Sequence, residues 1–141
     1  MSVFEITDKQ AYHDIMNSNH YDIVILDIYA EWCMPCKTLA PILNELASIY
    51  SSQKVLFCKL NSELGFKADI KGLPTIEFWV SGKLYHTVMG ADIPQIKTVL
   101  SKLIPGVEPA GISVSKKSAS APSQALKAGD SKYKTFAKYY N

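Results

Sequence analysis

Apolar and β-branched residues dominate two short stretches of the chain, and helical patterns surround them. Residues 23–29 predict a buried central strand in which Asp27 is the one charged residue, and residues 55–60 predict a second strand. A short strand over 3–6 comes before them, followed by a helix that begins at a polar cap near Asp8. The chain therefore opens with a strand and a helix and continues with buried strands.

Two longer segments repeat apolar residues at the spacing of an α-helix. The first runs from Cys33 to about Tyr50, and the second follows a cap at Asp92 and stops at Pro105-Gly106. The inward positions are Leu39, Ile42, Leu43, Leu46, Ile49 and Tyr50 in the first, and Ile93, Ile96, Val99, Leu100 and Leu103 in the second.

The remaining segments predict a β-hairpin and one short helix. Residues 75–80 and 83–89 flank Ser81-Gly82, a pair typical of a tight turn. A helix of one or two turns is expected near 62–69. Parallel crossovers followed by a hairpin give an α/β fold, with a mixed parallel and antiparallel central sheet and helices on both faces. We assign this domain to residues 1–105.

Residues 106–141 differ in composition from the domain. Ser, Ala, Lys, Pro and Gly prevail as far as about Ser131, and such a stretch buries too little apolar surface to offset the entropy of ordering. We expect a basic, flexible extension. Near 131–140 a short amphipathic helix is one interpretation, and a disordered terminus is the alternative, because isolated helices of this length are marginal in water. The apolar face of that helix would consist of Tyr133, Phe136, Ala137 and Tyr140.

Charge is uneven along the chain and narrows the classes of partner. The formal net charge is +2, and all fifteen basic residues are Lys. Residues 1–104 carry nine Lys and eleven acidic residues, whereas residues 105–141 carry six Lys and two acidic residues. The small net charge and the lack of guanidinium groups argue against a nucleic-acid partner.

The sequence predicts neither a targeting signal nor a membrane span. The first residues lack a basic region followed by an apolar run, and no stretch approaches the roughly eighteen apolar residues of a transmembrane helix. We therefore expect a cytoplasmic protein in a reducing compartment. Of the three cysteines, two are spaced Cys-x-x-Cys, which in such a compartment is typical of redox-active or metal-binding sites.

Cys33 and Cys36 stand directly after the buried strand and at the start of a helix. Unpaired amides and the helix dipole at that end stabilise an anion, so we expect the Cys33 thiolate to be a nucleophile near neutral pH. Cys36, one turn further in, would be shielded and close enough to attack a mixed disulfide formed at Cys33. Pro35 fits an early helical position because its missing N–H would be unpaired there.

Several separated motifs accompany the cysteine pair. They are Asp27, Ala30-Glu31-Trp32-Cys33, Pro35-Cys36-Lys37, Ala40-Pro41, Lys59-Leu60-Asn61, Gly72-Leu73-Pro74-Thr75, Gly82 and Gly90. With this series, the chain resembles the thioredoxin family over roughly residues 3–104. The resemblance implies a thioredoxin fold and a protein dithiol–disulfide oxidoreductase, which reduces target proteins through a reversible Cys33–Cys36 disulfide.

The resemblance also implies four candidate catalytic residues. Cys33 would attack, Cys36 would resolve, and Asp27 would move the proton of the second cysteine beside the ammonium group of Lys59. A carboxylate inside an apolar strand should by itself have a raised pKa, which suits a general base near pH 7. From residue type alone, the alternative is a structural ion pair between Asp27 and Lys59.

A second group of residues would bind the substrate polypeptide. Pro74 matches the cis proline of the family, and Leu73 before it would offer backbone groups to an extended substrate segment. Without the resemblance, Gly-x-Pro before a strand indicates only a turn. The full candidate set, which includes an apolar rim around Cys33, is Trp32, Met34, Pro35, Leu73, Pro74 and Gly90.

The chain departs from the family pattern at four places. Met34 replaces a familiar glycine, which makes the rim more apolar and can alter the redox potential. Tyr29 stands where tryptophan is common, a change we expect packing to absorb. The stretch over 59–74 is shorter than in familiar bacterial members, which trims the short third helix and puts the usual partner-docking surface in doubt. The extension after Pro105 has no counterpart in the family.

Other polar and titratable residues have simpler interpretations. Cys58 is expected to be a small buried hydrophobic residue rather than a regulatory thiol. The three histidines lack ligand spacing, so we predict no metal site and no cofactor. Glu77, in a strand, is expected to face a polar edge or solvent.

The resemblance implies two classes of partner: disulfide-containing target proteins and an NADPH-dependent thioredoxin reductase. An oxidase or isomerase is a weaker interpretation, because disulfide isomerases generally carry His where this chain has Pro35. A redox-independent binding subunit of a larger complex is the alternative from a different class. The sequence leaves the oligomeric state open.

Overall fold

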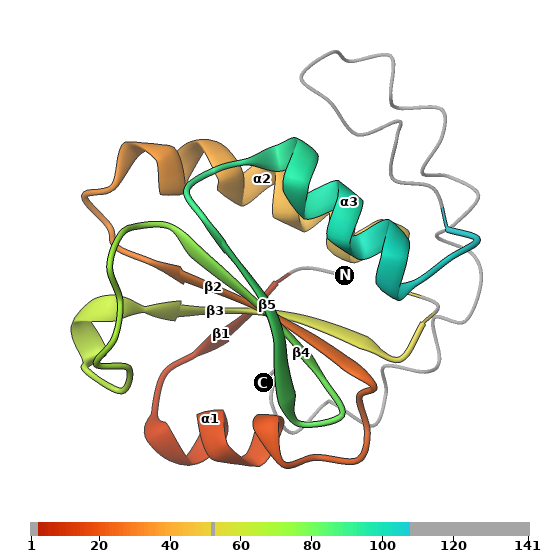
Figure 1. Ribbon diagram of the computed structural model, residues 1–141. Coiled ribbons are helices and arrows are strands. Elements are labelled where there is room, and N and C mark those ends of the chain that lie inside the picture. The colour runs from red at the N-terminus through yellow and green to blue at the C-terminus, as the bar shows by residue number, and fades with distance from the viewer. Residues whose placement is uncertain (1–2, 52, 108–141) are drawn as a thin grey trace.

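The computed structural model describes residues 3–51 and 53–107, which form a five-stranded sheet with helices on both faces (Figure 1). In chain order the elements are β1 (Phe4–Ile6), α1 (Lys9–Met16), β2 (Ile23–Tyr29), α2 (Met34–Ile49), β3 (Val55–Asn61), the 3-10 turn η1 (Ser62–Leu64), β4 (Thr75–Val80), β5 (Lys83–Met89) and α3 (Ile93–Leu103). From residue 108 on, the predicted extension lies outside the described residues.

The strand order is β1-β3-β2-β4-β5, with β3 parallel to both of its neighbours and β4 antiparallel to both of its own. The predicted α/β fold with a mixed sheet is therefore confirmed. So are the two predicted helix caps: the Asp8 carboxylate accepts the Ala11 N–H at 2.8 Å, and that of Asp92 accepts the Gln95 N–H at 3.1 Å.

Of the helix of one or two turns expected near 62–69, one turn is present, and it ends at Leu64. Only the single turn η1 forms, with the Asn61 side chain accepting the N–H of Glu63 at 2.9 Å. Gly65 ends the turn in the left-handed region, with φ of +80°, which favours glycine. The segment from Gly65 to β4 contains no regular helix, and its residues Phe66, Ile70 and Leu73 pack against the core on the α1 face of the sheet.

Two hydrophobic cores lie on opposite faces of the sheet, under α2 and α3 on one side and α1 on the other (Figure 1). Side chains alternate between faces along a strand, so in β2 Ile23 and Ile25 face α2 whereas Val24 and Leu26 face α1. The same alternation directs Asp27 toward α2. This placement puts a carboxyl group under the helix that carries the cysteines.

Glu77 does not face solvent, contrary to the expectation from sequence. It lies in β4, between β2 and β5, and is 7% exposed. Lys67 Nζ lies 3.3 Å from Glu77 Oε1, and the Trp79 indole N–H donates to the same oxygen at 3.0 Å. The charge of Glu77 is thus compensated by Lys67, in the segment between η1 and β4.

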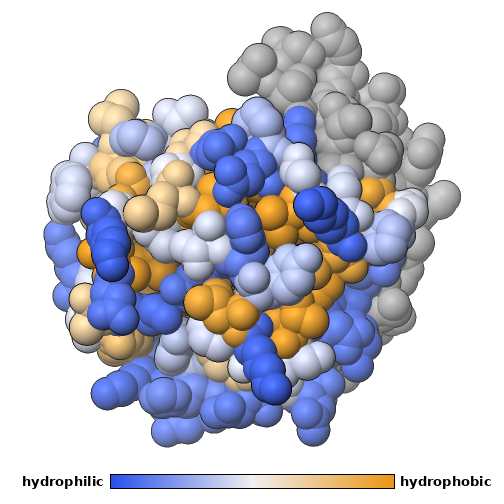
Figure 2. Space-filling model, viewed as in Figure 1, coloured by the Kyte–Doolittle hydropathy of each residue, from blue (hydrophilic) through white to orange (hydrophobic). Residues whose placement is uncertain are grey.

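The face in Figure 2 has hydrophilic side chains along its lower rim, over α1, and apolar side chains near its centre, over β5 and α3. Leu84 and Met89 of β5 are about half exposed. Within the described part of the chain, no helix is long and apolar enough to cross a membrane.

Candidate active site

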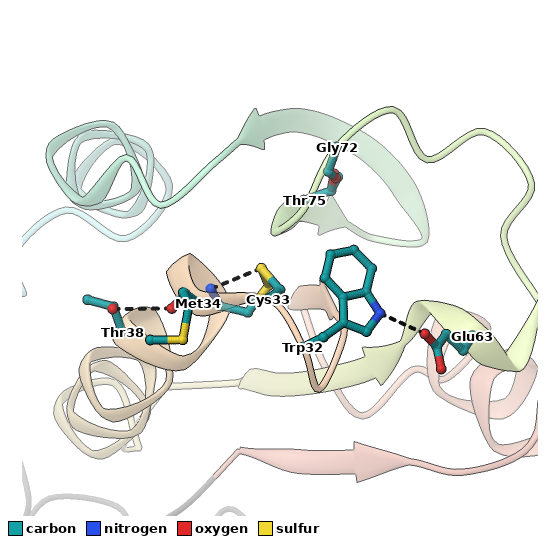
Figure 3. Close-up of a disulfide and its surroundings, with 8 residues drawn as sticks. Trp32, Cys33, Met34, Thr38, Glu63, Gly72 and Thr75 are labelled. Atoms are coloured by element: carbon teal, nitrogen blue, oxygen red, sulfur yellow. Dashed lines mark hydrogen bonds between the residues drawn. A yellow bond between two sulfur atoms is a disulfide. The ribbon is translucent and has the colours of Figure 1, made fainter.

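Cys33 and Cys36 form a disulfide at the N-terminus of α2, with their Cα atoms 5.2 Å apart (Figure 3). Cys33 is the N-cap of the helix, and its Sγ accepts the N–H of Cys36 at 3.2 Å. Pro35 occupies one of the first two helical positions, as predicted. An N–H group and the positive end of the helix dipole therefore point at Cys33 Sγ, the arrangement that stabilises a thiolate.

The cysteines themselves are buried, but the residues beside them are not. Both are 4% exposed, whereas Trp32 and Met34 are 68% and 65% exposed. The Trp32 indole N–H donates to Glu63 Oε2 at 2.8 Å, which fixes the indole beside Cys33 (Figure 3). In the disulfide state the two cysteines are thus equally buried, and the exposed fraction does not show the expected greater shielding of Cys36.

The loop before β4 lies against the disulfide. The Leu73–Pro74 peptide bond is cis, as the family resemblance implies, and Leu73 packs on the cluster of Ala30, Cys33 and Cys36. The N–H of Gly90 donates to the Pro74 carbonyl at 2.7 Å. Gly90 has φ of +86°, a conformation that favours glycine. The structure thus brings the predicted substrate-binding residues of three separate segments to one end of the sheet.

Asp27 and Cys36 both line a cavity of about 200 Å³. Asp27 is 3% exposed, and its Oδ1 has no hydrogen-bond partner among the described residues. Burial raises the pKa of Asp27 to about 7, against an opposing effect of Lys59 and with a smaller contribution from Glu5. Asp27 can therefore hold or release a proton near neutral pH.

The structural ion pair that sequence offered as an alternative, between Asp27 and Lys59, does not form. Lys59 instead pairs with Glu5 of β1, Nζ to Oε1 at 3.6 Å. Tyr29 packs against the cluster of Ala30, Cys33 and Cys36, and its hydroxyl also donates to Glu5 Oε2 at 2.7 Å. Sequence reasoning missed Glu5 and Glu63, since an exposed acid carries no local signal of a partner far along the chain.

Cys58 is buried on the α1 face of β3, as predicted, and its thiol donates to the Ile25 carbonyl at 3.5 Å. Burial raises the pKa of this thiol far above its ordinary value. Within residues 3–51 and 53–107, no group of three His, Cys, Asp or Glu side chains could hold a metal ion.

The match to known proteins extends over nearly all of the residues that the structure describes. The family model described as Thioredoxin matches residues 2–102. Thioredoxin 1 of Plasmodium falciparum is 32% identical over 101 residues, which make up 69% of this chain and 93% of that protein. The chain belongs to the thioredoxin family. The thioredoxin of Buchnera aphidicola is 36% identical over 93 residues, or 63% of this chain and 83% of that protein.

Solved structures of thioredoxins agree with this assignment. The structure of Plasmodium falciparum thioredoxin superposes with a TM-score of 0.63 at 30% identity, covering 71% of this chain and 98% of that one. A poplar thioredoxin h superposes with a TM-score of 0.66 at 26% identity, covering 75% and 99%. The fold is therefore the thioredoxin fold.

Family and geometry together define the reaction. The protein is a dithiol–disulfide oxidoreductase that reduces disulfides in proteins through the reversible Cys33–Cys36 disulfide. No observation favours a redox-independent binding subunit.

Proposed function

We propose that the protein reduces disulfides in extended or protruding segments of target proteins, and that an NADPH-dependent thioredoxin reductase restores its dithiol. The observation that carries the proposal is the position of the disulfide: Cys33 caps α2 between the exposed apolar side chains of Trp32 and Met34, and Cys36 opens onto the Asp27 cavity. An exposed apolar rim suits an unfolded polypeptide rather than a small hydrophilic disulfide.

Trp32, Met34, Leu73 and Gly90 would hold the substrate around Cys33. Pro35 would set the start of the helix, and Pro74 would orient Leu73. An extended segment would pair with the backbone of Leu73, next to the cis peptide bond. Pairing of this kind recognises backbone rather than sequence, which suits an enzyme with many targets.

In the chemical step, the Cys33 thiolate attacks one sulfur of the target disulfide, and the other sulfur leaves as a thiolate. Cys36 then gives its proton to Asp27 and attacks Cys33, which releases the second target thiol and closes the Cys33–Cys36 disulfide. The raised pKa of Asp27 makes its carboxylate a base of suitable strength for this proton. Lys59 would act on Asp27 through its charge.

The compartment we propose is the cytoplasm. Cys58 is the one free thiol of the described residues, and a dithiol enzyme with an unpaired thiol fits a reducing environment. Fractionation of cells that express the tagged protein tests this proposal, and recovery from an oxidising compartment would contradict it.

The deciding experiment is the reduction potential of the Cys33–Cys36 couple, measured by equilibration with a defined dithiol buffer. A value near the roughly −270 mV of thioredoxin supports the proposed direction, whereas a value at or above about −200 mV indicates an oxidase or isomerase. A coupled assay with a thioredoxin reductase should consume NADPH only when target disulfide is present. Cys58→Ser is the matched control and should leave both results unchanged.

Trapping of the intermediate tests the assignment of the two cysteines. Cys36→Ser should accumulate a mixed disulfide between Cys33 and the target, whereas Cys33→Ser should accumulate none. Biological function retained by the variant with both serines would instead favour a binding subunit.

A further inference from the structure

Lys59 lies between two carboxylates that come from its two neighbouring strands. In the parallel register, Glu5 of β1 is opposite Lys59 on one side and Asp27 of β2 is opposite it on the other. Residues paired in this way place their side chains on the same face of the sheet, here the face under α2. The single ammonium group therefore has two acids within reach, and which one it pairs with decides the charge environment of Asp27.

The ammonium group pairs with the outer acid. Lys59 Nζ lies 3.6 Å from Glu5 Oε1, and both side chains are more than one-third exposed. No ion pair joins Lys59 to Asp27, and Asp27 Oδ1 has no hydrogen-bond partner among the described residues. The exposed pair keeps its hydration, whereas a pair with Asp27 would move the ammonium into a site that is 3% exposed.

Tyr29 holds Glu5 in this position. Its hydroxyl donates to Glu5 Oε2 at 2.7 Å, so the two carboxylate oxygens have different partners, the phenol and the ammonium. Lys59 Nζ also lies 5.7 Å from the centre of the Tyr29 ring, within the range of a cation–π contact. All three side chains line the Asp27 cavity, and the partly exposed Lys59 and Glu5 form its solvent-facing mouth.

The elements around Asp27 contribute several charged and titratable groups to its surroundings. They are Glu5 of β1, Tyr29 of β2, Glu31 in the turn before α2, Cys36 and Lys37 of α2, and Lys59 of β3. Cys58 lies behind, on the opposite face of β3, and β4 presents Ile76 opposite Asp27 and thus adds no charge. Among the described residues that line the cavity, the one ion pair joins Lys59 to Glu5.

We infer that Glu5, oriented by Tyr29, is a positioning residue for disulfide exchange: it keeps the Lys59 ammonium at the mouth of the cavity, so that Asp27 can exchange a proton with Cys36. This inference rests on the proposed function. If Glu5 lost its charge, Lys59 could turn to Asp27 and stabilise the carboxylate, which would make it a weaker base. The charges act in the direction that this inference needs, since Lys59 lowers the pKa of Asp27 and Glu5 raises it.

The affected step is the second half of the reaction. The S–H bond of Cys36 breaks and its proton goes to the Asp27 carboxylate, while the sulfur electron pair forms the bond to Cys33 Sγ. The bond between Cys33 and the target sulfur breaks, and that sulfur leaves with the electron pair and takes a proton from water. The cysteine pair is oxidised by two electrons and the target is reduced by two, and Asp27 later returns its proton through the cavity.

The test is the titration of the Asp27 carboxyl in the intact, oxidised protein, followed by carbon NMR, in the parent and in Glu5→Gln. We expect the titration midpoint to fall by about one pH unit or more in Glu5→Gln, and by less in Tyr29→Phe. The pH profile of target reduction should move in the same direction. Glu45→Gln, which removes an exposed charge from α2, is the matched control and should leave the midpoint unchanged.

A second background separates action through Lys59 from the direct effect of the Glu5 charge. In Lys59→Met, the Glu5→Gln substitution should move the midpoint much less than it does in the parent. An unchanged midpoint in Glu5→Gln, or an equal shift in both backgrounds, overturns the inference. The NMR titration needs no turnover, so a parent protein that fails to reduce any target contradicts the proposed function and leaves this test decisive.

Discussion

Lys67, in the segment between η1 and β4, holds its ammonium nitrogen 3.3 Å from Oε1 of the buried Glu77. Lys67 Nζ also lies over the rings of Tyr12 and Trp79, at 5.7 and 5.6 Å from their centres. Burial acts to lower the pKa of Lys67, but the Glu77 carboxylate and Tyr12 outweigh it, so the pKa is raised. The ammonium group of Lys67 thus lies beside the Glu77 carboxylate and the rings of Tyr12 and Trp79, and links the segment after η1 to α1 and β4.

Lys67→Met should destabilise the protein by about 1–3 kcal/mol, because it leaves the Glu77 carboxylate buried without a counter-charge. Urea unfolding at neutral pH measures the change. The double variant Lys67→Met, Glu77→Gln should recover most of the loss, since the amide oxygen can still accept the Trp79 N–H and carries no charge. A double variant as unstable as the single one would contradict the coupling.

The stability of the oxidised protein should fall as pH rises from about 4 to about 7, because of Asp27. Its pKa is raised from 3.8 to about 7, mainly by burial. Well below pH 4 the Asp27 carboxyl is protonated in both the folded and the unfolded chain. Between about pH 4 and pH 7 the unfolded chain releases this proton while the folded chain keeps it, which favours the unfolded state and lowers the free energy of unfolding. The loss for this group is at most about 4 kcal/mol.

Asp27→Asn removes this loss, so the variant should unfold at higher urea than the parent at pH 8 and show no such advantage at pH 4. Both proteins are compared in the oxidised state. An advantage of equal size at the two pH values would mean that packing, rather than the proton, explains it.

Gly90→Ala should weaken substrate binding beyond its effect on stability. Alanine at φ of +86° costs about 1–2 kcal/mol, and the displaced backbone would disturb the 2.7 Å bond from Gly90 to Pro74. Gly65→Ala is a matched control, with φ of +80° and no atom within 4 Å of an added Cβ at either site. Both variants should lose similar stability, and only Gly90→Ala should raise KM for a target disulfide.

Cys58 should resist alkylation until the protein unfolds. It is 1% exposed and its thiol has a raised pKa, so little thiolate is present and little reagent can reach it. Mass spectrometry of the reduced, folded protein after iodoacetamide treatment should find Cys33 modified and Cys58 intact. Modification of Cys58 at the rate of a free thiol in the folded state would refute this prediction.

The elements and the thiol chemistry could be predicted because their signals are local. The apolar run over 23–29, the caps at Asp8 and Asp92 and the Ser81-Gly82 turn each depend on residues within one or two turns of the chain. The length of the helix after β3 was harder to predict, because Gly65 ends η1 after a single turn.

The charge environment of the site could not be predicted in the same way. The sequence presents Asp27 and Lys59 as natural partners, yet Lys59 pairs with Glu5, which is separated from it by more than fifty residues. Glu77 similarly finds Lys67, and Trp32 finds Glu63, across loops whose course depends on the packed fold. An ion pair is decided by distance and hydration in three dimensions, and neither is encoded in spacing along the chain.

Taken alone, the sequence determined the fold class, the cysteine pair at a helix N-terminus and the family, because periodicity, capping and motif order are properties of neighbouring residues. Only the tertiary structure decided which acid pairs with the Lys59 ammonium, that the buried Asp27 shares a cavity with Cys36, and which residues pack beside Glu77 after η1. The reason is that strand order and register bring β1, β2 and β3 side by side, and the strength of a charge interaction depends on that arrangement and on the water it excludes.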